Sequence, residues 1–280
     1  MVGEKRKGIM MLKKFTVGLA VLLMAFLAAC GNSDEAKEVY QKAVEAGEKM
    51  ESVEMDMVIN QTMESDAMEG EMVMDMDTKS AMTIDPLAMH QTGTISMEVE
   101  GMPIETEMEM YLTDTDFYMY ESMSETWLKM SADMMPTEMM NTDQTAQDQL
   151  EMLESFMDDV DFSEEDDYYV FKFEGEGDEF ADLTEELIKE NLGEETFADL
   201  GVEISEVLEE MTIHSMYYEL HIDKETYDTT KVITNMDFDI NAEGESLRMN
   251  QEMTATYTGI NTVDEIAVPQ EVIDEAQEIE

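Results

Sequence analysis

The sequence predicts an α+β fold in which a large, curved, antiparallel sheet covers a few α-helices. Long segments alternate apolar and polar residues with a period of two, and only a few segments repeat apolar residues every three or four positions. Strands and helices do not alternate regularly, so crossover helices are absent and the sheet should be antiparallel. Because one face of so long a sheet is apolar, it has to be covered, and folding the sheet over its few helices achieves this.

Alternating segments account for most of the expected strands. Methionine takes many of the apolar positions, as in Met72, Met74 and Met76, which alternate with acidic residues. Turn residues at Glu69-Gly70, Asp85-Pro86 and Gly101-Met102-Pro103 separate such segments as hairpins require. The strands are expected around residues 55–59, 72–76, 95–99, 108–112, 117–120, 127–130, 168–173, 216–222, 232–240 and 247–257.

Helical periodicity predicts one helix before the sheet and further helices in the middle of the chain. Ser33 or Asp34 can cap a first helix that runs to about Met50. Residues 137–160, 178–193 and 197–208 carry apolar side chains at helical spacing. These segments are the helices that the sheet is expected to cover.

The first 29 residues have the pattern of an export signal. Basic residues between Lys5 and Lys14 precede an apolar stretch over residues 15–29, which is shorter than the roughly 20 residues of a membrane-spanning helix. Met1, Met10 and Met11 are alternative starts that all leave a basic region before it.

The end of this signal, Leu27-Ala28-Ala29-Cys30, resembles the bacterial lipobox, in which diacylglycerol is attached to the cysteine and the chain is cut just before it. The resemblance implies a lipid anchor on Cys30 at the extracytoplasmic face of the cell membrane. The expected organisation is a signal peptide at 1–29, a lipidated tether at 30–35 and a single domain at 36–280. Cys30 is the only cysteine, so no disulfide forms within the chain.

Charge excludes one class of partner. The chain has 69 acidic and 15 basic residues, for a net charge of −54. Such a surface repels phosphate groups, so binding to nucleic acid or to anionic lipid head groups through basic patches is excluded.

The layout as a whole resembles the LolA/LppX-type bacterial lipoproteins. The resemblance combines the lipobox, the opening helix, the alternating strands, the helical middle and the closing segment Leu220-His221-Ile222-Asp223-Lys224-Glu225-Thr226-Tyr227. The end of the chain, from Asn261-Thr262-Val263 to Val272, is similar to that of related Gram-positive lipoproteins of unknown function. The resemblance implies an incomplete β-barrel around helices, a hydrophobic cavity for a lipid or acyl chain, and no enzymatic activity.

Methionine is the residue type that carries the functional prediction, with 32 in the chain. Its flexible side chain fills irregular spaces and adapts to varied apolar ligands. A cavity for a hydrophobic ligand is therefore expected to be lined by Met55, Met57, Ile59, Met72, Met74, Met76, Met97, Met108, Met110, Met216, Tyr218, Met236 and Phe238.

Two other functions remain open at this level. The helices can fill the interior completely, which gives a structural or signalling lipoprotein that acts through its surface. Alternatively, thioethers such as those of Met72, Met74 and Met76 can bind Cu(I) or Ag(I), although no His or Cys lies beside them.

Other side chains give no catalytic or cofactor site. His214 and His221 lie seven apart on one expected strand and should face opposite ways, and with His90 they form no metal cluster. Carboxylate pairs such as Asp158-Asp159 are expected by chance in so acidic a chain, so we predict no catalytic residue, no metal ligand and no cofactor. The aromatic residues either rim a cavity mouth or pack along edge strands; they are Tyr118, Tyr120, Trp127, Tyr168, Tyr169 and Phe171. Nothing in the sequence indicates a protein partner.

Overall fold

The structure is a computed structural model that describes residues 32–65, 70–99, 102–122, 124–132, 160–175, 211–242 and 245–279. Most of these residues form β-strands. The elements are α2 (Asn32–Gly47), β1 (Ser52–Ser65), β2 (Glu71–Thr83), β3 (Ala88–Val99), β4 (Met102–Thr113), β5 (Asp116–Glu121), β6 (Thr126–Ser131), β7 (Asp161–Glu164), β8 (Tyr168–Gly175), β9 (Met211–Asp223), β10 (Thr229–Ala242), β11 (Glu245–Thr258), α8 (Gln270–Glu275) and β12 (Gln277–Glu278).

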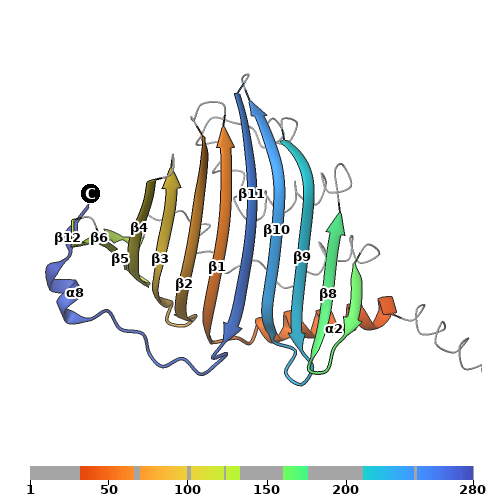
Figure 1. The fold of residues 1–280 in the computed structure, drawn as a ribbon. Helices are drawn as coiled ribbons and strands as arrows, with labels where there is room; N and C mark the ends of the chain where they lie inside the picture. Colours follow the sequence, from red (N-terminus) through yellow and green to blue (C-terminus); the bar gives the residue numbers. More distant parts are fainter. Residues whose placement is uncertain are drawn as a thin grey trace, which may run out of the picture.

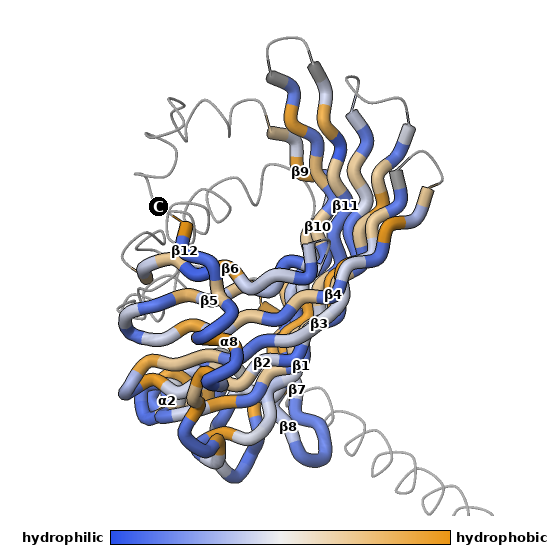
Figure 2. The backbone as a smooth tube through the Cα atoms, turned by 90° about the vertical axis from the view of Figure 1, so that its left-hand side faces the viewer, coloured by the Kyte–Doolittle hydropathy of each residue, from blue (hydrophilic) through white to orange (hydrophobic). Residues whose placement is uncertain are grey.

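The strands form one twelve-stranded sheet in the order β12-β6-β5-β4-β3-β2-β1-β11-β10-β9-β8-β7 (Figure 1). The short pair β12–β6 is parallel, and the other pairs are antiparallel. Because β12 and β7 lie at opposite edges, the sheet is open, and it curves rather than lying flat (Figure 2). The predicted antiparallel sheet is confirmed, and its open, curved form agrees with an incomplete barrel.

The centre of the sheet is a pair of strands from opposite ends of the chain. β1 and β11 pair antiparallel from Glu54 opposite Thr258 to Ser65 opposite Leu247. Strands β2 to β6 extend the sheet on one side of this pair, and β10 back to β7 extend it on the other. The first and last thirds of the chain therefore share one continuous surface.

The two faces of the sheet differ in chemistry. Residues directly opposite each other on antiparallel strands point to the same face. We call the side that carries Met57 the methionine face, and the side that carries Asp56 and Asp77 the acidic face. Asp77 stands opposite Thr94 of β3, which stands opposite Glu107 of β4, so acidic residues of several strands share that second face.

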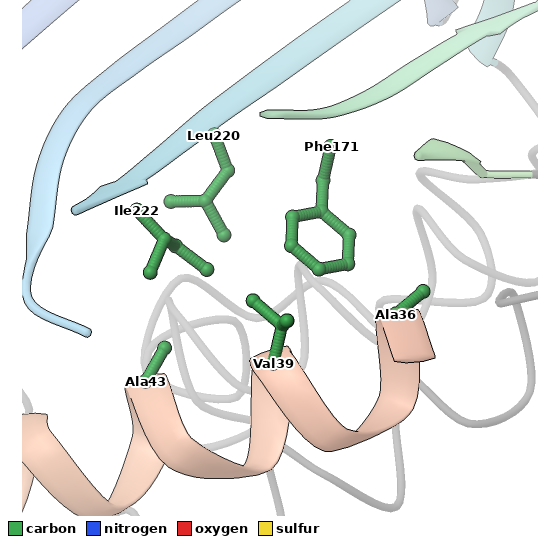
Figure 3. Packing of buried hydrophobic residues seen from close by; sticks show 6 residues of the cluster. All are labelled: Ala36, Val39, Ala43, Phe171, Leu220 and Ile222. Atoms are coloured by element: carbon green, nitrogen blue, oxygen red, sulfur yellow. The ribbon is translucent and has the colours of Figure 1, made fainter. Parts of the chain in front are cut away.

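Helix α2 packs on the methionine face at the β8–β9 end. Ala36, Val39 and Ala43 lie on one side of the helix and contact Phe171 of β8 together with Leu220 and Ile222 of β9 (Figure 3). The predicted opening helix is thus present. Ser33 and Asp34 lie inside its first turn rather than capping it, because the helix already begins at Asn32. An acidic residue such as Asp34 in that turn is favourable beside the positive end of the helix dipole.

Helix α8 lies on the other face. Val272 of α8 packs with Tyr111 of β4 and Tyr118 of β5, whose register places them on the acidic face. Among the described helices, one therefore covers each face, so the expectation of a sheet wrapped around its helices is met only by α2. The helices predicted within 137–160, 178–193 and 197–208 lie outside the described residues.

Short elements at the edges differ from the sequence prediction. The strands β7 and β12 and the helix α8 have too few residues to show a period, and they were not predicted. Pro103 was expected in a turn but lies in β4 opposite Glu98, near the start of the strand.

Asn261 ties the C-terminal segment to the start of β1. Its Oδ1 accepts hydrogen bonds from the backbone N–H of Glu51 at 2.6 Å and of Ser52 at 3.4 Å, and its own N–H donates to the Ser52 carbonyl at 2.8 Å. Its backbone is left-handed, with φ of 57°, a conformation that asparagine adopts more readily than most residues. This residue therefore fixes where the segment leaves β11 for the other side of the sheet.

We expect Asn261→Ala to lower the free energy of unfolding by about 2 kcal/mol, because it removes the side-chain acceptor and strains a left-handed backbone. Asn261→Gly removes only the acceptor and should cost about half as much. Urea unfolding followed by circular dichroism measures both. Equal stability of Asn261→Ala and the parent chain would show that this junction is not fixed by Asn261.

Candidate functional site

The strand register brings all thirteen predicted cavity residues onto the methionine face. Met57 stands opposite Thr78 of β2, Thr78 opposite Gly93 of β3, and Gly93 opposite Met108 of β4. On the other side, Met236 of β10 stands opposite both Gln251 of β11 and Met216 of β9. The remaining members follow by the alternation of each strand, and hydrophobic positions recur along the strands accordingly (Figure 2).

Gly93 shows how closely the strands approach at the centre of this face. A Cβ at Gly93 would lie 2.8 Å from Cγ2 of Thr78 and would overlap the backbone carbonyl oxygen of Asp77. Thr78 is almost fully buried, with 1% of its surface exposed. The missing side chain at Gly93 therefore makes room for β2.

The methionine face is packed at both ends and less covered in the middle. At one end, Met216 packs with Phe173 and Ile213, and Tyr218, Met236 and Phe238 lie against this cluster. At the other end, Met110 packs against Leu112 and Phe117. Between them lie side chains that are only half-buried: Met55, Met57, Ile59, Met72, Met74, Met76, Met97 and Met108.

More methionines share this face than the sequence prediction included. Met63 continues the alternation of β1 beyond Gln61, the polar residue that interrupts it. Met249 and Met253 belong to β11, a strand that was predicted without predicting which of its residues share this face. Strands β2, β3, β5 and β6 add Met82, Met89, Met119 and Met130. Extending each alternation to the end of its strand would have found them.

Polar side chains also lie on the methionine face, where the register places Gln61, Gln251, Thr78, Ser80 and Gln91. Gln61 donates a hydrogen bond from Nε2 to Sδ of Met249 at 3.3 Å, so one of its amide N–H groups is paired with a thioether. Burial raises the pKa of the Tyr218 hydroxyl, and burial also raises that of Tyr257. Both rings therefore stay neutral at physiological pH.

All three histidines lie on the acidic face, contrary to the prediction that His214 and His221 face opposite ways. A bulge at the Asp237/Phe238 step of the β9–β10 pairing adds one residue to the alternation of β9. His214 and His221, which are seven residues apart, therefore point to the same face. His214 contacts Asp239 at 2.7 Å, His221 contacts Glu219 at 2.5 Å, and His90 contacts Glu109 at 3.1 Å. Within the described ranges, no group of three or more His, Cys, Asp or Glu side chains is arranged to hold a metal ion.

Glu219 is the centre of a polar network on the acidic face. It is 8% exposed and receives contacts from Lys172 at 3.1 Å, from His221 and from the Tyr217 hydroxyl. Burial alone would raise the pKa of this carboxyl, but hydrogen bonds from these three groups outweigh burial and lower it to about 2. The hydrogen bond to Glu219, with burial second, raises the pKa of Tyr217 to about 12.

The aromatic residues separate into two groups at opposite ends of the sheet. Tyr118 and Trp127 pack with α8, and the ring of Tyr120 lies 5.4 Å from that of Trp127, tilted by 52°. Tyr169 and Phe171 pack at the α2 end. These aromatic residues therefore pack near the edges of the sheet and do not form one rim around a cavity mouth.

Cys30 and the predicted signal lie outside the described residues, so lipid attachment stays a prediction. In the part of the chain that the structure covers, no helix has both the length and the apolar composition to cross a bilayer.

A model of one protein family matches residues 35–277, which is most of the chain. The chain belongs to the DUF6612 family. This is a family of unknown function, and no curated protein matches the chain. The matched residues of this DUF6612 protein include strands β1 to β11 in full.

Three solved structures are similar to this DUF6612 protein at 10% sequence identity each. Lipoprotein LppX of Mycobacterium tuberculosis aligns with a TM-score of 0.38 over 82% of this chain and 97% of its own. A DUF1329 family protein from Desulfovibrio piger aligns at 0.23 over 79% and 90%. A beta-barrel-like protein of the DUF1849 domain from Brucella abortus aligns at 0.23 over 75% and 99%.

Proposed function

We propose that this DUF6612 protein is a non-enzymatic binding protein that holds a hydrophobic ligand, such as the acyl chain of a lipid, against the centre of its methionine face. The observation that supports this is the methionine-rich surface that neighbouring strands share, packed at its ends and half-buried in the middle. If this face served only to hold the fold together, Met57 and Met76 would be buried as fully as Phe171 and Met216 are.

Desolvation supplies the binding free energy in this proposal. Each methylene moved from water to an apolar surface gains about 0.8 kcal/mol, so about ten methylenes retain several kcal/mol after ordering costs. Unbranched thioether side chains adapt to chains of varied shape, which favours a class of ligands over a single one. No covalent step is required, so no catalytic residue is needed.

Charge restricts the head group of such a ligand. With a net charge of −54 and carboxylates on the reverse side of the same strands, the protein repels anionic head groups. A zwitterionic or neutral lipid fits this field best.

The anchor belongs to the same proposal. Cys30 lies two positions before the start of α2, and α2 packs on the sheet through Val39. A lipid on Cys30 would hold the sheet close to the extracytoplasmic face of the membrane, where a lipid ligand is available.

The test is native mass spectrometry of the full chain extracted in mild detergent. We expect a non-covalent lipid adduct that dissociates on collisional activation, whereas the anchor remains attached. Replacing Met57 and Met76 together by glutamine should lower the apparent affinity at least tenfold, because two polar amides would then meet the acyl chain.

Two controls keep this test specific. Replacing the same two residues by leucine preserves an apolar surface of similar volume and should preserve the adduct. Val58→Gln alters the neighbouring residue on the acidic face, where Val58 is 40% exposed, and should also leave the adduct unchanged. A parent chain that is always empty would contradict the proposal and favour a structural or signalling lipoprotein.

A further inference from the structure

Three methionines stand side by side on the methionine face, one on each of three adjacent strands. Met63 of β1 lies directly opposite Met249 of β11 and directly opposite Met72 of β2. Directly opposed residues have Cβ atoms about 4.5–5.5 Å apart. We call Met63, Met72 and Met249 the thioether row.

This arrangement differs from methionines that alternate along one strand. Two residues apart on a strand, side chains on one face are about 7 Å apart, and three of them span twice that distance. In the thioether row, Met63 is a direct neighbour of both others, and each side chain has three rotatable bonds through which its sulfur can turn inward.

The contacts already direct one sulfur toward the middle strand. Sδ of Met249 lies 3.3 Å from Nε2 of Gln61, which is two residues from Met63 on β1. The sulfur of Met249 therefore contacts a side chain of β1, the strand that carries Met63.

The thioether row is the only one of its kind among the described strands. Met57 stands opposite Ala255 and Thr78, and Met76 stands opposite Ile59 and Ile95. Other methionines of this face meet at most one methionine directly, as Met74 meets Met97.

The surroundings select the kind of ion. The next residue on β10 in this row is Phe238, opposite Met249, and the polar neighbours on β1 are the uncharged Gln61 and Ser65, so the donors are uncharged sulfur atoms. Soft thioethers favour Cu(I) over hard cations such as Mg²⁺ and Ca²⁺. The net charge of −54 raises the local concentration of cations around the protein.

We propose that Met63, Met72 and Met249 form a binding site for a soft monovalent cation, Cu(I) or its redox-stable analogue Ag(I). The ion is held by three sulfur atoms from three strands. Binding links β11, β1 and β2 at the end of the sheet opposite to the Asn261 junction, and it requires no lipid on the rest of the face.

The test is an anaerobic competition between the full chain and bicinchoninate for Cu(I). We expect the protein to withdraw one equivalent of Cu(I), and Met63→Leu/Met72→Leu/Met249→Leu to weaken this affinity at least tenfold. The control Met57→Leu/Met76→Leu/Met108→Leu removes three methionines from the same face that do not oppose one another, and it should change the affinity less than twofold. Leucine keeps the apolar volume, so both variants should fold.

X-ray absorption of the Ag(I) complex provides the second readout, with three sulfur neighbours expected. No withdrawal of Cu(I), an equal loss in both triple variants, or a nitrogen and oxygen shell would overturn the proposal. The lipid adduct is measured separately on the parent chain, so failure of the metal site and failure of lipid binding are separate results.

Discussion

Phe171→Ala is expected to lower the free energy of unfolding by about 4 kcal/mol, the largest single effect that the described residues predict. Phe171 is 3% exposed, its ring lies 4.9 Å from that of Phe162 and 6.2 Å from that of Tyr40, and it packs with Val39 and Leu220. Alanine leaves a cavity between α2 and the sheet that these neighbours cannot fill. Urea unfolding monitored by circular dichroism measures the loss.

The same variant tests whether α2 is fastened mainly through this contact. Hydrogen exchange of the α2 amides should accelerate more than that of β1 and β11, because the cavity opens under the helix. Val58→Ala is the control, since Val58 is exposed on the opposite face and should change stability by less than about 0.5 kcal/mol. A loss below 1 kcal/mol for Phe171→Ala would mean that α2 is held by other contacts.

The sequence predicted the long elements because their periods persist over many residues. The alternation of Met72, Met74 and Met76 identified β2, and helical spacing from Ala36 to Ala43 identified α2. Pairing between β1 and β11 could not be predicted in the same way, because no local pattern records which distant strand becomes a neighbour. The four residues of β7 and the two of β12 are too few to show a period.

In the candidate site, too, local patterns were predictable and long-range strand register was not. Alternation correctly assigned Met57 and Met236 to a common face, since a face is a local property once the strand is known. The bulge that moved His214 was not predictable, because it arises from the register between β9 and β10. The thioether row could not be predicted either, because the long-range register of three strands decides that Met63 lies opposite both Met72 and Met249.

Glu219→Gln is expected to lower the free energy of unfolding by about 2 kcal/mol at pH 7. The pKa of Glu219 falls from its ordinary 4.5 to about 2, because hydrogen bonds from Tyr217, His221 and Lys172 outweigh the cost of burial. A shift of that size corresponds to about 3 kcal/mol, and water around the half-exposed Lys172 reduces it. Glutamine keeps the shape of the side chain but cannot carry the charge that these donors stabilise.

The pH dependence of the difference between the parent chain and Glu219→Gln isolates this carboxylate from the other 68 acidic residues. Because the folded-state pKa is lowered, the stabilisation is complete above about pH 5 and disappears as the pH falls from 4.5 to about 2. The two unfolding curves should therefore converge in acid. Glu252→Gln, an exposed position on the same face, should stay close to the parent at every pH. A constant difference across this range would show that the ionisation of Glu219 is not what stabilises the folded chain.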